Sequence, residues 1–113
     1  MVLSVNQRTF RQEVLESNTP VLVHFLAPWC GLCRMINPIL LRFAAESAQP
    51  IKLVSINADE NLLLANAHRL TSLPTLILFD GGKVVHRLEG FYGRDDLQKA
   101  LEKIIRSPLA TSA

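Results

Sequence analysis

Hydrophobic and polar residues along the chain form stretches with strand character that are separated by stretches with helical spacing. Residues 20–27 and 51–57 are short runs rich in β-forming residues. They show no clean alternation of apolar and polar positions, which is typical of strands buried on both faces. Residues 75–79 form a third apolar run. A turn at residues 80–82 (Asp-Gly-Gly) then leads into residues 83–90, and this order predicts an antiparallel hairpin.

Four other segments have apolar residues at helical spacing, namely residues 6–17, 30–48, 60–69 and 94–106. Asn6 is a suitable N-cap for the first of them, and Asp59 for the third. Pro38 lies inside the second helix and should kink it. Helices and strands therefore alternate until the hairpin, and a short strand fits before the first helix. We expect an α/β fold with a mixed central sheet of four to five strands flanked by four helices.

The composition indicates one small globular domain. The chain has 113 residues, of which 49% are hydrophobic and 19% are charged, so it is too apolar for a disordered protein. We assign residues 1–106 to a single domain and residues 107–113 to a flexible C-terminal tail. The 12 basic and 10 acidic residues are spread along the chain and give a net charge of +2. Since no basic run is suited to phosphates, we expect no nucleic acid partner.

Signals for export or membrane insertion are not visible in the sequence. The first residues lack a charged segment followed by an apolar one, and no apolar run approaches the roughly 20 residues of a membrane span. We therefore expect a cytoplasmic protein without a membrane partner. Thiols stay reduced in that compartment, so a closely spaced cysteine pair there is typical of catalysis or metal binding rather than of a structural disulfide.

The two cysteines of the chain, Cys30 and Cys33, lie where a buried strand passes into a helix. A structural zinc site usually needs four Cys or His ligands, and the histidines are scattered without a second paired motif, so we expect no metal. His68 and His86 are expected at the surface. Two inert core thiols are the other alternative, since free cysteines are often buried. A two-residue gap at a strand-to-helix junction is a poor way to fill a core, and it favours redox chemistry.

The position of Cys30 indicates how such chemistry would start. The free N–H groups and the dipole at a helix N-terminus favour an anion, and hence the thiolate of Cys30. Cys33 follows one turn later and would lie close enough to close a disulfide. The Cys30 thiolate would attack a substrate disulfide to form a mixed disulfide, which Cys33 would resolve with release of the reduced substrate.

The stretch WCGLC that ends at Cys33 resembles the WCGPC active site of the thioredoxin family, which also follows an apolar strand. Other features match in the same order: Pro38 in the following helix, SLPT at residues 72–75, a DGGKVV hairpin, and Gly90 before the last helix. The resemblance extends over about residues 4–106 and implies a thioredoxin fold. It also implies a protein-disulfide oxidoreductase whose redox centre is the Cys30–Cys33 disulfide and which needs no cofactor.

The resemblance further implies a substrate-binding surface around Cys30. The Leu73–Pro74 peptide bond would be cis, which exposes the main chain of Leu73 for pairing with an extended substrate segment. Ordinary packing is the alternative role for the aromatic residues of this surface. Disulfide-containing proteins are the implied substrates, a flavin- or ferredoxin-dependent thioredoxin reductase is the implied electron donor, and we expect a monomer. The contacting residues would be Trp29, Gly31, Leu32, Leu73, Pro74, Gly90 and Phe91.

Three residues depart from the family pattern. Leu32 replaces the family's proline and restores an N–H that can point toward the Cys30 sulfur, so we predict a less reducing protein than one with WCGPC. His24 stands where the family has a buried aspartate, and Ser55 where it often has the lysine partner of that aspartate. A buried carboxylate without a partner is costly, so these two changes belong together. Our hypothesis is that His24 is the general base for Cys33, and the alternative is a core histidine with satisfied hydrogen bonds.

The whole sequence predicts a thioredoxin-fold oxidoreductase that reduces protein disulfides. Two alternatives stay open at this point. One is a non-catalytic module that senses redox state or holds a partner. The other is a more oxidising or isomerising enzyme, which Leu32 favours. The departures at His24 and Leu32 also leave open whether the usual reductase supplies the electrons.

Overall fold

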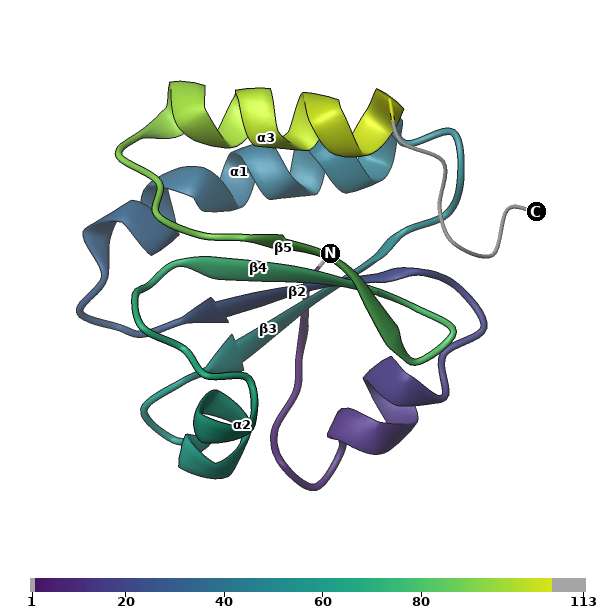
Figure 1. Cartoon of the computed structure of the whole chain (residues 1–113), viewed down its shortest axis with the longest axis vertical. Coiled ribbons are helices and arrows are strands. Elements are labelled where there is room, and N and C mark those ends of the chain that lie inside the picture. The colour runs from purple at the N-terminus through teal and green to yellow at the C-terminus, as the bar shows by residue number, and fades with distance from the viewer. Residues whose placement is uncertain (1, 107–113) are drawn as a thin grey trace.

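A five-stranded sheet forms the middle layer of the molecule, with helices on both of its faces (Figure 1). The computed structural model describes residues 2–106. β1, β3 and β2 run parallel, whereas β4 is antiparallel to both β2 and β5, so the mixed sheet and the short first strand are confirmed. The strand order is β1-β3-β2-β4-β5, with bounds Leu3–Ser4 for β1, Val21–Leu26 for β2, Lys52–Asn57 for β3, Thr75–Asp80 for β4 and Lys83–Leu88 for β5.

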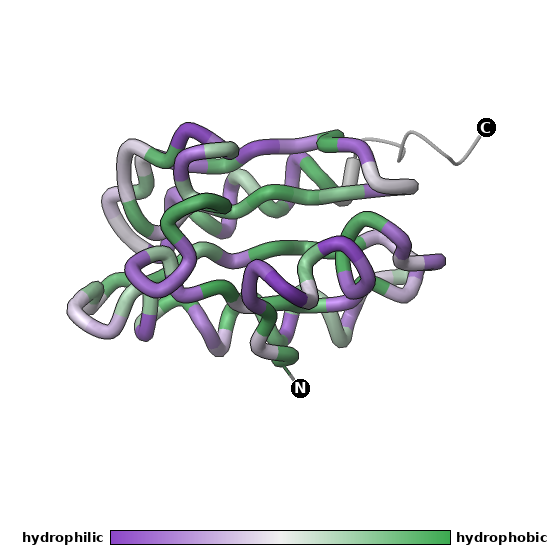
Figure 2. Tube along the Cα trace, turned by 90° about the horizontal axis from the view of Figure 1, so that it is seen from below, coloured by the Kyte–Doolittle hydropathy of each residue, from purple (hydrophilic) through white to green (hydrophobic). Residues whose placement is uncertain are grey.

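The helices form the two outer layers. α1 and α3 lie side by side on one face of the sheet, and α2 lies on the other face with a short π-helical segment, η1 (Figure 1). Figure 2 shows that hydrophobic residues are concentrated along the extended central segments of the chain. Each segment with helical spacing contains a helix, and the predicted α/β fold is confirmed. The bounds are Arg11–Leu15 for η1, Gly31–Glu46 for α1, Leu62–Ala67 for α2 and Arg94–Arg106 for α3.

Successive side chains of β2 belong to two separate apolar clusters. Leu22 packs in the cluster beneath α1 and α3, whereas its neighbours Val21 and Val23 pack in the cluster on the other face. Because helices cover both faces, every residue of β4 and nearly every residue of β2 is buried. This double burial explains why these strands show no alternation of apolar and polar residues. The first cluster includes Leu22, Ile36, Leu40, Leu76 and Leu97, and the second includes Val23, Phe25, Val54, Ile77 and Phe79.

The first helical segment starts where predicted but is shorter than expected. The Asn6 side-chain oxygen accepts hydrogen bonds from the N–H groups of Arg8 (2.8 Å) and Thr9 (3.2 Å), as an N-cap does. The segment then turns and continues as η1, which ends at Leu15. The predicted helix over residues 6–17 is therefore a capped turn that leads into a π-helix.

The cap predicted for the third helical segment is wrong. α2 begins at Leu62, with Asn61 rather than Asp59 at its N-cap, and Asn61 makes no side-chain cap hydrogen bond. The side-chain oxygen of Gln7 instead accepts a hydrogen bond from the N–H of Leu63 at 2.9 Å. Asp59 lies in the turn before α2, three residues from its first residue, and its carboxylate accepts a hydrogen bond from Trp29.

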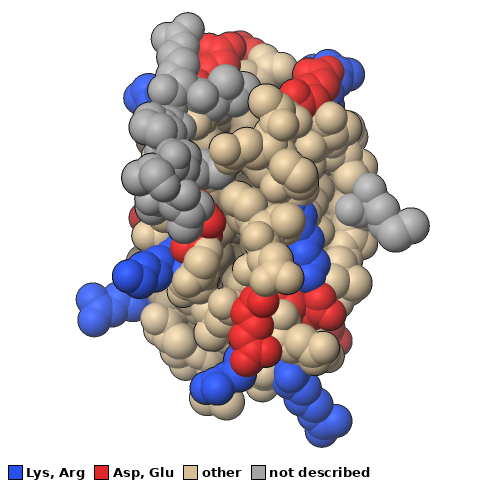
Figure 3. Space-filling view, turned by 90° about the vertical axis from the view of Figure 1, so that its right-hand side faces the viewer, with Lys and Arg blue, Asp and Glu red and all other residues tan. Residues whose placement is uncertain are grey.

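The β4–β5 connection lies at the end of the molecule opposite the disulfide. Gly81 and Gly82 both have positive φ, at 63° and 81°, as a two-residue hairpin turn requires, so the predicted hairpin is confirmed. Figure 3 views this end, where charged side chains of both signs are scattered and no large area of one sign gathers. No helix within residues 2–106 is long and apolar enough to cross a membrane. The predicted flexible tail at residues 107–113 lies outside the described residues.

Candidate active site

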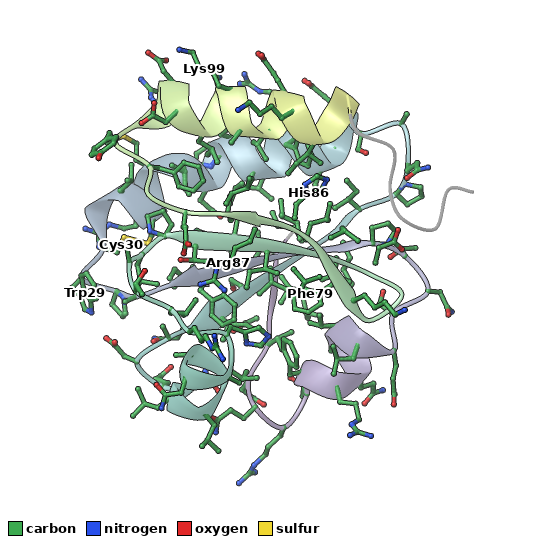
Figure 4. All side chains as sticks on the ribbon, in the orientation of Figure 1. Trp29, Cys30, Phe79, His86, Arg87 and Lys99 are labelled. Carbon is green, nitrogen blue, oxygen red and sulfur yellow. A yellow bond between two sulfur atoms is a disulfide. The ribbon has the colours of Figure 1, made fainter. Side chains whose placement is uncertain are left out.

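The two cysteines form a disulfide at the start of α1, the helix that follows β2. Cys30 is the N-cap residue of α1 and Cys33 lies in its first turn, with 5.3 Å between their Cα atoms. Figure 4 shows the disulfide at the edge of the molecule, beside the beginning of α1. The proximity that was predicted from the two-residue spacing is confirmed. No group of His, Cys, Asp and Glu residues in the described part of the chain is arranged to hold a metal.

The N-terminus of α1 presents a hydrogen-bond donor to the sulfur of Cys30. The N–H of Cys33 donates to Cys30 Sγ at 3.1 Å, and the first turn of α1 contains no acidic residue. Among the described residues, the N–H of Leu32 makes no such bond in this disulfide form, and its predicted role in the reduced form stays a prediction. This N–H and the positive end of a 16-residue helix favour negative charge on Cys30 Sγ once the disulfide is reduced.

His24 is buried on the face of β2 that α1 covers. It lies two residues from Leu22 and opposite Leu76 of β4, and both of these pack with Ile36 of α1. Ile36 is one turn after Cys33, and Cys33 is also on the buried side of α1. The structure therefore places His24 and Cys33 in the same layer, at the same end of the sheet.

The ring of His24 has an unusual environment. The residue is 1% exposed, and neither ring nitrogen has a hydrogen-bond partner among the described residues. Burial lowers the pKa of His24 to about 4, so the imidazole is neutral at pH 7. Among the described residues no group satisfies the ring, so the structure gives no support to the alternative of a core histidine with satisfied hydrogen bonds. Ser55, its neighbour on β3, makes no hydrogen bond to the ring.

The loop before β4 reaches the same end of the sheet. The Leu73–Pro74 peptide bond is cis, as the resemblance implied. Thr75 follows it, lies opposite Phe25 of β2, and donates a hydrogen bond from its hydroxyl to the Ser72 carbonyl at 2.7 Å. Pro74 is buried and Leu73 is half-buried against the cluster beneath α2 and η1. This loop and the cysteine loop are therefore carried by adjacent strands.

The other residues predicted to bind substrate differ in how much surface they present. Trp29 is 68% exposed, and its indole N–H donates to Asp59 Oδ2 at 2.8 Å. Gly31 and Gly90 are exposed. Leu32 and Phe91 are half-buried against the cluster beneath α1 and α3, so packing accounts for part of both side chains.

Sequence reasoning missed two exposed apolar side chains near these segments. Met35 is 54% exposed in the second turn of α1, and Tyr92 is 96% exposed between Phe91 and α3. The partner of Trp29, Asp59, was missed as well. No local pattern marks these three residues, since exposure and a contact across 30 positions depend on tertiary packing.

The histidines outside the site have structural surroundings. His68 is not a surface residue as predicted: its ring lies among Phe10, Phe25 and Phe79, with centroid distances of 5.5 to 5.9 Å. Its Nδ1 lies 2.8 Å from a carbonyl of the preceding turn. His86 is half-buried on β5, so its predicted surface position is also only partly correct.

These features define a class of protein. A disulfide across two intervening residues, at the N-terminus of a helix that follows a buried central strand and beside a cis-proline loop, is an arrangement for thiol–disulfide exchange. The sulfur of Cys30, at the N-cap, has the environment of a nucleophile. The sulfur of Cys33 is close enough to attack it and displace a bound substrate sulfur. The fold and the site together are those of a dithiol–disulfide oxidoreductase.

Comparison with known proteins identifies the family. The Thioredoxin family model matches residues 1–103. Thioredoxin 1 of Nostoc sp. is 44% identical over 99 residues, which cover 88% of this chain and 92% of that protein. The thioredoxin of Pyropia yezoensis is 41% identical over 104 residues, covering 92% and 97%. The chloroplastic thioredoxin M4 of Arabidopsis thaliana is 40% identical over 104 residues, covering 92% and 54%. The chain belongs to the thioredoxin family.

Membership of this family confirms the predicted activity. The protein is a thiol–disulfide oxidoreductase that acts on protein disulfides, and the alternative of a module without turnover is not favoured. Its partners are therefore a reductase and proteins that contain disulfides.

Proposed function

We propose that the chain reduces disulfides in other proteins by two successive exchanges, at Cys30 and then at Cys33. The observation that carries this proposal is the place of Cys30 at the α1 N-cap, with a main-chain N–H directed at its sulfur. The Cys30 thiolate attacks a substrate sulfur, forms a mixed disulfide and releases the other substrate thiolate, which takes up a proton. Cys33, deprotonated, then attacks Cys30 Sγ, and the second substrate sulfur leaves as a thiolate that also takes up a proton. This leaves the Cys30–Cys33 disulfide, which a reductase returns to two thiols with two electrons and two protons.

Reduction of insulin with a small dithiol as electron donor tests this function. Wild-type protein should accelerate the reaction, and Cys30→Ser should abolish the acceleration because the attacking sulfur is gone. Cys33→Ser should stop after one exchange. A redox-sensing or binding module would give no acceleration by the wild-type protein, and acceleration that survives Cys30→Ser would contradict the assigned nucleophile.

We also propose that His24 accepts the proton of Cys33 when the mixed disulfide is resolved. Its support is a neutral, deeply buried ring with an unused acceptor nitrogen, in the layer that also contains Cys33. Burial lowers the pKa of His24 to about 4, so the ring is neutral at pH 7 and has a nitrogen that can accept a proton. The rate of resolution and its pH profile should differ between wild type and His24→Asn. Identical rates and profiles would exclude His24 as the base.

The proposed substrate surface surrounds Cys30 at this end of the sheet. Its support is the exposed ring of Trp29 and the two loops that adjacent strands bring together. An extended segment of the substrate would pair with the main chain of Leu73, while apolar side chains of the substrate contact the rest of the surface. The residues proposed to contact the substrate are those that the sequence predicted, namely Trp29, Gly31, Leu32, Leu73, Pro74, Gly90 and Phe91.

The redox couple is proposed to be less reducing than that of a thioredoxin with proline at position 32. Leu32 has an N–H that proline lacks, which gives the reduced form one more donor for a Cys30 thiolate beside the N–H of Cys33. The reduction potential of the Cys30–Cys33 couple should differ by tens of millivolts, since about 30 mV corresponds to 1.4 kcal/mol. Equilibration with glutathione measures it for wild type and Leu32→Pro. A wild type that is equally or more reducing than Leu32→Pro would contradict the proposal.

The cellular setting completes the proposal. We propose that residues 1–106 act as one monomeric domain in the cytoplasm, without a bound cofactor, and accept electrons from a flavin- or ferredoxin-dependent thioredoxin reductase. Turnover with each purified reductase type would identify the donor, and sedimentation at two protein concentrations would test the monomer.

A further inference from the structure

The ring of Trp29 is held in place although most of it is exposed. It is the only tryptophan of the chain, it directly precedes Cys30, and Figure 4 shows both residues at the same edge of the molecule. An exposed side chain with this freedom would ordinarily sample several rotamers. Here the indole N–H donates to Asp59 Oδ2 at 2.8 Å, so the orientation of the ring depends on the position of one carboxylate.

That carboxylate is positioned by the last residue of β3. The side-chain oxygen of Asn57 accepts hydrogen bonds from the N–H groups of Asp59 (2.9 Å) and Glu60 (3.3 Å), which forms an Asx-type turn. The turn is anchored a second time, because the side-chain amide of the buried Asn61 donates to the Asn57 carbonyl at 2.9 Å. The Asn61 side-chain oxygen in turn accepts from the N–H of Gln7 at 2.9 Å. Asp59 is exposed and lies outside any helix or strand, so these bonds fix its backbone.

We infer that Asn57 is a positioning residue of the active site, which acts through Asp59 to hold the Trp29 ring ready for a protein substrate. The inference rests on the proposed contact between Trp29 and the substrate. A ring that is already oriented loses less conformational freedom when the partner binds, so the affinity for the partner is higher. Loss of the turn should therefore weaken binding of protein substrates. It should leave the chemistry at the sulfurs unchanged, because a small disulfide does not need the ring.

Asn57→Ala removes both acceptor bonds of the turn, and Asn57→Asp restores an oxygen that can accept them. Ser17→Ala is the matched control, because Ser17 also holds a turn through its side chain, accepting from the Thr19 N–H at 3.3 Å, but precedes β2 at the opposite end. The readouts are the emission and acrylamide quenching of Trp29, the KM and kcat for insulin, and the rate with bis(2-hydroxyethyl) disulfide.

Asn57→Ala should raise KM for insulin about fivefold, the size expected when one side chain has to be ordered during binding. Its kcat and its rate with the small disulfide should stay at the wild-type values, while the emission and quenching of Trp29 change. Asn57→Asp should bring KM and emission back toward wild type, and Ser17→Ala should alter neither. Should Asn57→Ala fail to fold, Asp59→Ala removes the acceptor of the indole directly and should give the same pattern.

Four results would overturn the inference. Unchanged emission and quenching of Trp29 in Asn57→Ala would show that the turn does not hold the ring. An equal loss toward insulin and the small disulfide would show a general structural effect. A rise in KM with Trp29→Ala but not with Asn57→Ala would reject the positioning role and leave the proposed function intact. If Trp29→Ala itself leaves KM unchanged, the proposed contact fails, and the inference fails with it.

Discussion

Lowering the pH should destabilise the oxidised protein through one side chain, the buried imidazole of His24. In the unfolded chain this group takes up a proton as the pH falls through its ordinary pKa of 6.5, whereas burial lowers the pKa to about 4 in the folded protein. Between these two values the unfolded state binds more protons. The free energy of unfolding is therefore highest above pH 6.5 and decreases as the pH falls toward 4.

The size of this effect follows from the same two values. One pKa unit corresponds to about 1.4 kcal/mol, so a shift from 6.5 to about 4 corresponds to about 3 kcal/mol in total. About 2.5 kcal/mol of this should already be lost between pH 7 and pH 4.5. Solvent should not weaken this loss of stability, because His24 is only 1% exposed and water does not reach the ring in the folded protein.

Urea unfolding of wild type and His24→Leu at both pH values isolates this contribution. Leucine has a similar volume, does not titrate and leaves no buried nitrogen without a partner, so the variant should be at least as stable as wild type at pH 7. All other titrating groups are shared and cancel in the difference. Wild type should lose about 2.5 kcal/mol more than the variant on going to pH 4.5. Equal losses in the two proteins would mean that the ring is hydrated or partnered, and would refute the reasoning.

Two further predictions concern stability. Gly82→Ala should lower the free energy of unfolding by about 2 kcal/mol in a urea titration, because φ is 81° and a Cβ would lie 2.9 Å from the Leu15 carbonyl oxygen. Gly93→Ala is the control and should have little effect, because a Cβ at Gly93 would meet no atom within 4 Å. Arg87→Gln should lower the free energy of unfolding by about 1 to 2 kcal/mol in thermal unfolding, because its guanidinium donates to two carbonyls at the end of α2. Glu89→Gln, which removes only the ion pair with Arg87, should lower it by under about 1 kcal/mol. Equal losses would contradict the claim that the bonds to the carbonyls matter more than the ion pair.

The central strands and the site of attack could be predicted because their signals are local. The apolar run at residues 20–27 has no alternation, and the structure shows why, since helices cover both faces of β2. Cys30 comes three residues after that run and precedes residues with helical spacing, so its place at a helix N-terminus could be derived from the order of residues alone. The cis bond before Pro74, by contrast, came from family resemblance and not from any local pattern.

Contacts between residues far apart in the chain could not be predicted in this way. Asp59 has the pattern of a helix cap, but the indole of Trp29, 30 positions earlier, takes its carboxylate. His68 is the C-cap residue of α2, a short and mostly exposed helix. Only the tertiary structure brings Phe10, Phe25 and Phe79 around its ring. The missing hydrogen bonds of His24 are likewise a property of the packed core rather than of the sequence around it.

The most direct test of the central claim is to capture the intermediate of the exchange. Reduced Cys33→Ser should form a mixed disulfide with insulin that persists, because the resolving sulfur is absent, and mass spectrometry of the digested complex should locate the bond at Cys30. Reduced Cys30→Ser should form little of this complex, since Cys33 lies inside α1, whereas Cys30 is at the N-cap and receives the Cys33 N–H. Equal capture by both variants, or capture only through Cys33, would contradict the assignment of Cys30 as the attacking group.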